Sequence, residues 1–275
     1  MNLFSFLDLG IALLYFLGAL LFVGGVLGNN AQLKKVSLIF TVLGFGLHTG
    51  DLGLKLALTS EFTFTQGRFY FSFLAWTFLL IYLLLWLRLK LQFLALTAAP
   101  LALILFTSSM VVNTAELAIP EQLSYLWFGL HVTSLFISIA LLAMASGAGI
   151  CYLFLDKQLK NKTKPGKLRK GFPALSSFDT VNHWAVSIGF PLFTVGALSG
   201  FLWARFTWGQ MFTWDPKEVL TIITWFLFAY LFHQRLAVGW KGKKPARLAT
   251  WLFLLSLVSL LIINFFFPTH HSFQS

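Results

Sequence analysis

The chain has 275 residues, of which 58% are hydrophobic and only 11% are charged, and its mean hydropathy is +0.80. This composition excludes a water-soluble globular domain and predicts a protein that lives in a bilayer. The net charge of +11 needs no nucleic-acid partner, because cations that flank membrane helices and meet anionic membrane lipids account for it.

A helix that crosses the hydrocarbon layer needs about 20 mainly apolar residues. Eight stretches of the sequence meet this requirement, near residues 4–28, 36–58, 69–88, 91–111, 124–155, 178–204, 218–238 and 247–267. The first has no basic leader and no cleavage site of small residues, so we expect it to remain as a helix. We predict an all-α, polytopic membrane helical bundle of about eight transmembrane helices, forming a single transmembrane domain over residues 1–275.

The loop charges orient this bundle, because Lys and Arg are retained on the cytoplasmic side of short loops. One set of loops carries most of the cations, including the dense run from Lys157 to Lys170. The loops of the opposite set carry only Arg68, Arg205 and Lys217. We therefore expect both termini and the 206–217 stretch to lie on the extracytoplasmic side.

Polar side chains inside the predicted helices are costly and mark candidate sites. His48, Asp51 and Lys55 share one face of the second helix. Two interpretations stay open: Asp51 and Lys55 neutralise each other while His48 finds a hydrogen-bond partner, or the three form a functional site. His233 lies well inside its predicted helix, where an imidazole needs a partner or a ligand.

The stretch "FTWGQMFTWDPKEV" at 206–219 begins the seventh predicted helix. Asp215 as N-cap, Pro216 at N1 and Glu218 at N3 predict a capping box. Capping does not explain why Trp203, Trp208 and Trp214 gather here beside cations. Indoles and cations suit a flat, doubly anionic ligand, for which haem is the obvious candidate. His131 and His271, predicted on the same side of the membrane, could then supply axial imidazoles.

The segment "GALSGFLWARFTWGQMFTWDPKEVLTIITWFLFAYLFHQR" (196–235) resembles the tryptophan-rich WWD segment of haem-handling proteins of cytochrome c biogenesis, the CcsA, ResC and CcmC group, with HemX as a relative. The similarity extends to "LHVTSLFISIALLAMASGAGICYLF" (130–154) and to the final "HHSF". It covers roughly the last 150 residues.

The resemblance implies that haem b is bound transiently at the external 206–217 segment. Its site residues would be the external axial ligands His131 and His271, the transmembrane His233 and its partner His48, and the platform Trp203, Trp208, Trp214 and Asp215. No residue is implied as a nucleophile or general base. The chain would be a subunit of a cytochrome c synthase that presents haem to a CxxCH apocytochrome c, together with a CcsB/ResB-like membrane partner. The membrane would be the bacterial cytoplasmic membrane, or the thylakoid in a plastid or cyanobacterium.

Three alternatives stay open at this stage. The last ligand is either His270 or His271. The chain is either a CcsA-type assembly protein or a HemX-like membrane regulator of haem synthesis. A small-solute permease, with His48, Asp51 and Lys55 lining a path, is the third class.

Overall fold

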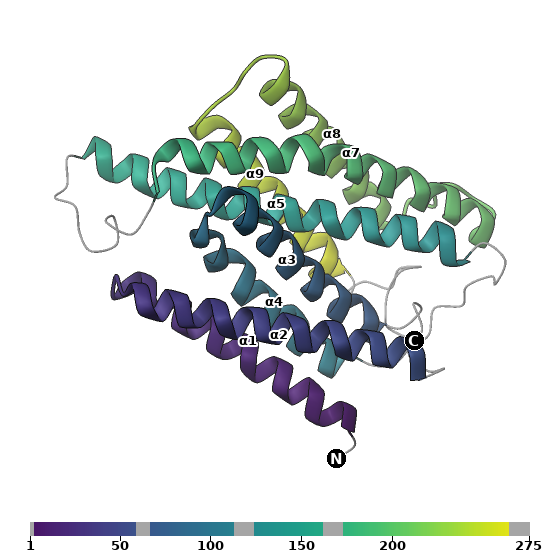
Figure 1. The fold of residues 1–275 in the computed structure, drawn as a ribbon. Coiled ribbons are helices and arrows are strands. Elements are labelled where there is room, and N and C mark those ends of the chain that lie inside the picture. The colour runs from purple at the N-terminus through teal and green to yellow at the C-terminus, as the bar shows by residue number, and fades with distance from the viewer. Residues whose placement is uncertain (1–2, 59–66, 113–123, 162–172, 264–275) are drawn as a thin grey trace. The chain divides into compact units, whose positions relative to one another are not determined.

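The computed structural model describes residues 3–58, 67–112, 124–161 and 173–263. All regular elements among these residues are helical: α1 (Leu3–Leu27), α2 (Ala31–Leu58), α3 (Gly67–Leu89), η1 (Gln92–Leu94), α4 (Ala95–Val111), α5 (Ser124–Lys160), α7 (Leu175–Trp208), α8 (Pro216–Leu236), α9 (Lys243–Leu257) and η2 (Val258–Ile263). Figure 1 shows their order along the chain.

Seven helical segments within the described residues are long and apolar enough to cross a membrane. They match the first seven predicted spans, and the fold class of a polytopic helical membrane protein is confirmed. The eighth predicted span, 247–267, corresponds to α9 and η2 and runs on into residues outside the described part.

The helices group into two compact units. Unit 1 contains α1 to α4, and unit 2 contains most of α5 together with α7, α8, α9 and η2. The expectation of a single transmembrane domain stays a prediction.

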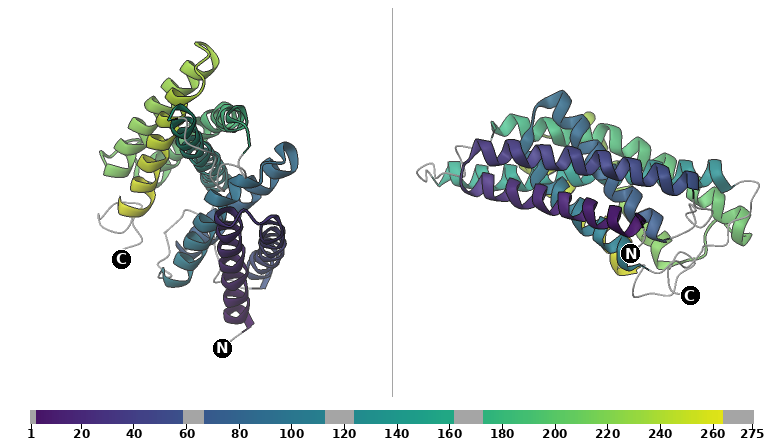
Figure 2. Two further views of the ribbon diagram at one scale, coloured as in Figure 1. Left: turned by 90° about the vertical axis from the view of Figure 1, so that its left-hand side faces the viewer. Right: turned by 60° about the horizontal axis from the view of Figure 1, so that its bottom comes forward.

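Unit 1 begins with a helical hairpin in which α1 packs along α2, and Figure 2 shows these two helices side by side in both views. The Asn30 side chain starts α2 by accepting hydrogen bonds from the backbone N–H groups of Gln32 and Leu33, at 2.9 and 3.2 Å. Gly44 allows the close approach, because a Cβ there would lie 2.8 Å from the Tyr15 ring. Helix α4 packs on both α1 and α3, which closes the unit.

Unit 2 is built on an antiparallel pair, α5 and α7. Ser138 of α5 donates a hydrogen bond to the Gly189 carbonyl, and the earlier His131 contacts the later Gly196 of α7. Helix α8 then packs on α7, and α9 packs on α8.

A buried ion pair ties α7 to α8 at the end of unit 2 opposite the 206–217 segment. The Arg235 guanidinium donates to both carboxylate oxygens of Asp179, at 2.9 and 2.8 Å, and its side chain is 2% exposed. Asp179 also accepts from the backbone N–H of Gly242 before α9. These contacts fix the start of α7, the end of α8 and the turn before α9 relative to one another.

Candidate functional site

The structure distributes the predicted site residues over both units. Unit 2 holds His131, His233, Trp203, Trp208, Trp214 and Asp215, and unit 1 holds His48. His271, with its neighbour His270, lies outside the described residues. Trp208 is the last residue of α7, and its side chain also lies outside the described part.

His131 lies half-buried against α7, and its Nδ1 is 2.6 Å from the backbone carbonyl oxygen of Gly196. A carbonyl oxygen can only accept, so Nδ1 carries the proton and donates it. Nε2 then holds its lone pair, and within the described residues it has no hydrogen-bond partner. An Nδ1–H that donates to a backbone carbonyl is the arrangement that orients histidines which bind a metal through Nε2.

Trp203 belongs to the same face of α7 as this carbonyl. Gly196, Gly200 and Trp203 follow one another at helical spacings of four and three, so they share one side of α7. Trp203 is 8% exposed and so is part of the packing of unit 2. It is placed to support the helix near His131 rather than to offer its indole as an open surface.

The chain leaves α7 through Gly209, whose φ of +74° suits glycine beyond a helix C-terminus. The exposed guanidinium of Arg205 donates to the Gly209 carbonyl and holds this exit. The cation therefore lies at the start of the tryptophan-rich segment, as its position in the sequence predicted.

Trp214 presents its indole outward. It is 79% exposed and has a φ of +61°, an unusual conformation for a bulky residue. Phe212 supports it, with ring centroids 4.9 Å apart in an edge-to-face arrangement. Backbone strain of this kind is often found at functional sites, so the exposed indole is a candidate platform for a flat ligand.

The predicted cap of α8 is confirmed in part. Asp215 is the N-cap, and its carboxylate accepts a hydrogen bond from the backbone N–H of Lys217 at 2.8 Å, with Pro216 next in the chain. The reciprocal half of the capping box differs from the prediction, because the Glu218 carboxylate accepts from the backbone N–H of Thr213 at 2.6 Å. The left-handed turn at Trp214 brings Thr213, rather than the cap residue, within reach of Glu218.

We expect the cap and the indole to respond differently to substitution. Asp215→Asn should keep most of the cap, whereas Asp215→Ala should cost about 1 kcal/mol of helix stability, because Asn replaces the accepting oxygen and Ala does not. Unfolding of the purified protein in mild detergent measures this difference. Equal losses for Asn and Ala would show that the hydrogen bond to Lys217 is not what Asp215 contributes.

His233 lies in the last turn of α8, and its side chain is exposed in the structure. The sequence placed it deep in its helix with a need for a partner. The structure places it three residues before the end at Leu236, where its backbone carbonyl accepts from Ala237 and Val238. The imidazole is accessible at the end of α8 opposite Asp215.

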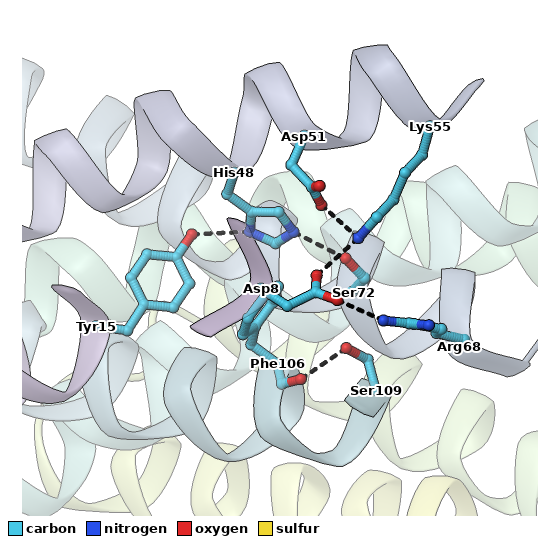
Figure 3. Close-up of polar contacts among 9 residues, drawn as sticks. All are labelled: Asp8, Tyr15, His48, Asp51, Lys55, Arg68, Ser72, Phe106 and Ser109. Carbon is cyan, nitrogen blue, oxygen red and sulfur yellow. Dashed lines mark hydrogen bonds and ion pairs between the residues drawn. The ribbon is translucent and has the colours of Figure 1, made fainter. Parts of the chain in front are cut away.

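His48 is fully buried in unit 1 and bonded at both ring nitrogens (Figure 3). Nδ1 is 2.8 Å from the Tyr15 hydroxyl, and Nε2 is 2.8 Å from the Ser72 hydroxyl. The Phe106 ring packs against the imidazole with centroids 4.7 Å apart. His48 therefore has the hydrogen-bond partner that one interpretation required, and either nitrogen must give up a bond before it can bind anything else.

A buried charge network lies one to two turns along α2 from His48 (Figure 3). The predicted Asp51–Lys55 ion pair is confirmed, at 2.7 Å. Lys55 also contacts Asp8 of α1 at 2.7 Å, and Asp8 pairs with Arg68 of α3. Asp8 and Arg68 were not predicted as members, although an aspartate in the apolar first helix was a signal that a partner was needed.

Unit 2 carries three kinds of group that fit a haem in their chemistry: the His131 imidazole, whose Nε2 has no hydrogen-bond partner among the described residues, the exposed indole of Trp214, and the Arg205 guanidinium at the start of the 206–217 segment. The comparison with known proteins points the same way. Residues 67–271 match the model of a family described as cytochrome C assembly protein. The chain belongs to this family.

Three relatives show how far the similarity extends. The cytochrome c biogenesis protein CcsA of Chlorella vulgaris is 32% identical, over 87% of this chain and 87% of its own length. The CcsA protein of Pyropia yezoensis is 28% identical over 98% of this chain and 95% of its own. That of Prochlorococcus marinus is 29% identical over 96% and 93%. The similarity to these relatives therefore extends over both units, including the first helices, which lie before the residues that the family model matches.

Proposed function

We propose that this protein acts in cytochrome c biogenesis by binding haem at the outer end of unit 2 and presenting it to apocytochrome c. The observation that carries the proposal is His131, whose Nδ1–H is committed to the Gly196 carbonyl and whose Nε2 is left with its lone pair. The family membership and the CcsA relatives support the pathway. They also favour an assembly protein over a HemX-like regulator or a permease.

In this proposal His131 and His271 are the axial ligands. Trp214 and Trp208 would offer aromatic faces, Trp203 supports α7 from within the unit, and Arg205 and Lys217 would attract the two carboxylates of the substrate. Asp215 holds the segment by starting α8.

The attachment reaction is the addition of each cysteine S–H of a CxxCH motif across a vinyl C=C bond of the haem, so no group leaves and the thiols come from the apocytochrome. This chain orients the haem and excludes water, and none of its side chains needs to act as a nucleophile.

His48 and His233 would act in delivery rather than at the outer site. His233 is exposed at the end of α8 opposite Asp215, where it can receive a ligand. His48 would bind only after Ser72 or Tyr15 releases its ring, which makes it a gated position. Transfer between these histidines remains part of the proposal.

We extend the proposal to the orientation of the chain in the membrane, to its protein partner and to the membrane in which it lies. Both termini and the 206–217 segment would face away from the cytoplasm, as the loop charges predict. A CcsB/ResB-like partner would complete the synthase, since the connections of this chain are too short to hold an apocytochrome. The membrane would be the bacterial cytoplasmic membrane, or a thylakoid; the relatives from algae and a cyanobacterium are consistent with either.

The spectrum of the purified protein tests the proposal. Wild type should carry a Soret band, and Trp214→Ala should retain haem about three to ten times more weakly, because it loses one aromatic contact. Trp251→Ala removes a comparably exposed indole, 69% exposed on α9, and should leave haem retention unchanged. Wild type that stays free of haem under saturating supply would refute the proposal and favour the permease.

A further inference from the structure

Two glycines on one face of α7 are in close contact with α5 at His131 and Leu135. A Cβ built at Gly200 would lie 2.4 Å from Cε1 and 2.6 Å from Nδ1 of the His131 ring. A Cβ at Gly196 would lie 2.7 Å from the Leu135 side chain. No real Cβ tolerates such distances, so the ring of His131 lies directly against the α7 backbone at Gly200.

The hydrogen bond to Gly196 fixes the orientation of the His131 ring at this contact. Close packing of small residues alone would explain only how near the two helices come. Here the carbonyl of Gly196, one turn before Gly200, accepts from Nδ1 of the same ring at 2.6 Å. The ring is thus held by its edge through Nδ1 and by its position against Gly200, with Nε2 3.3 Å from the same Cβ position and without a hydrogen-bond partner among the described residues.

We infer that Gly196 and Gly200 form a positioning cradle for the His131 imidazole, with Gly200 as the residue that sets where Nε2 points. The inference rests on the proposed function for its consequence, since the ligand that Nε2 would bind is haem iron. Gly196 contributes a backbone acceptor, which no side-chain substitution removes. Gly200 contributes space, because it has no side chain, and the methyl group of an alanine would fill that space.

The imidazole response tests the cradle. In a His131→Gly background, free imidazole should fill the vacated space and restore the low-spin spectrum of haem. Adding Gly200→Ala should raise the imidazole concentration for half-restoration by about tenfold, because the new methyl group occupies part of the vacated space and disturbs how the imidazole is oriented. Gly189→Ala is the matched control on the same helix, because its Cβ would meet Phe228 at 3.1 Å and Leu141 at 3.6 Å rather than His131, and it should leave that concentration unchanged.

Protein accumulation provides a second readout if Gly200→Ala alone folds poorly. Removal of the His131 ring removes the atoms with which the new Cβ collides, so the double variant should accumulate as well as His131→Gly alone. If Gly200→Ala lowers accumulation equally in both backgrounds, Gly200 contacts something other than the ring and the inference is wrong.

Solid-state ¹⁵N spectra of histidine-labelled protein without haem separate this inference from the proposed function. We expect a neutral Nδ1–H tautomer that disappears in His131→Gln. If that tautomer is present but His131→Gly leaves the haem spectrum intact, the proposed function fails. The other outcome is that His131→Gly changes the haem spectrum, but the His131→Gly, Gly200→Ala double variant needs the same imidazole concentration as His131→Gly. In that case only the inference about the cradle fails.

Discussion

Replacing His131 with glycine is expected to reduce cytochrome c assembly to less than about one tenth, and millimolar imidazole is expected to restore part of it. Two imidazoles on one iron give low-spin haem, and loss of either changes both spin state and retention. Glycine leaves a space at Gly200 that free imidazole can enter, because the ring that filled it is gone. Covalently bound haem in membrane cytochromes, and the spectrum of the purified protein, measure the two effects.

His271→Gly should behave in the same way, although this residue lies outside the described part of the chain. His270→Gly decides between the two neighbouring histidines, since only the ligand should show the imidazole response. His183→Gly is the control within unit 2, because its half-buried ring lies near the start of α7, far along the helix from Gly200. If imidazole rescues neither His131→Gly nor His271→Gly while wild type is haem-loaded, these two residues are not the axial pair.

The sequence could predict the parts of this protein that depend on neighbours along the chain. Apolar length predicted the helices, and the order of Asp215, Pro216 and Glu218 predicted where α8 begins. The spacing of Asp51 and Lys55 predicted their ion pair, because four residues make one turn of a helix.

Features that depend on contacts between helices were not predictable in this way. Asp8 lies 47 residues before its partner Lys55 and 60 residues before its partner Arg68 along the chain. Gly196 acts through a backbone carbonyl, which every residue has, so no residue type marks it. The left-handed conformation of Trp214 was equally hidden, because sequence preference assigns such a φ to Gly or Asn.

The second large effect is expected at the charge network of unit 1. Lys55→Met should lower the free energy of unfolding by about 3 to 5 kcal/mol, the usual cost of removing one partner from buried charges. The Lys55 ammonium lies 2.7 Å from both Asp8 and Asp51, whose side chains are 5% and 0% exposed. Without it Asp51 loses its ion pair, and Asp8 keeps its ion pair with Arg68. Unfolding by a graded denaturing detergent, followed by loss of helical circular dichroism, measures the change.

Lys35→Met is the matched control, because Lys35 is exposed near the start of the same helix and its loss should change stability by less than about 0.5 kcal/mol. A compensating variant gives the sharper test. Lys55→Met combined with Asp51→Asn removes a carboxylate together with its cation, so it should be more stable than Lys55→Met alone. If the added substitution instead lowers stability further, then Asp51 stabilises α2 through something other than its charge. The buried network would in that case not be what holds α1, α2 and α3 together around His48.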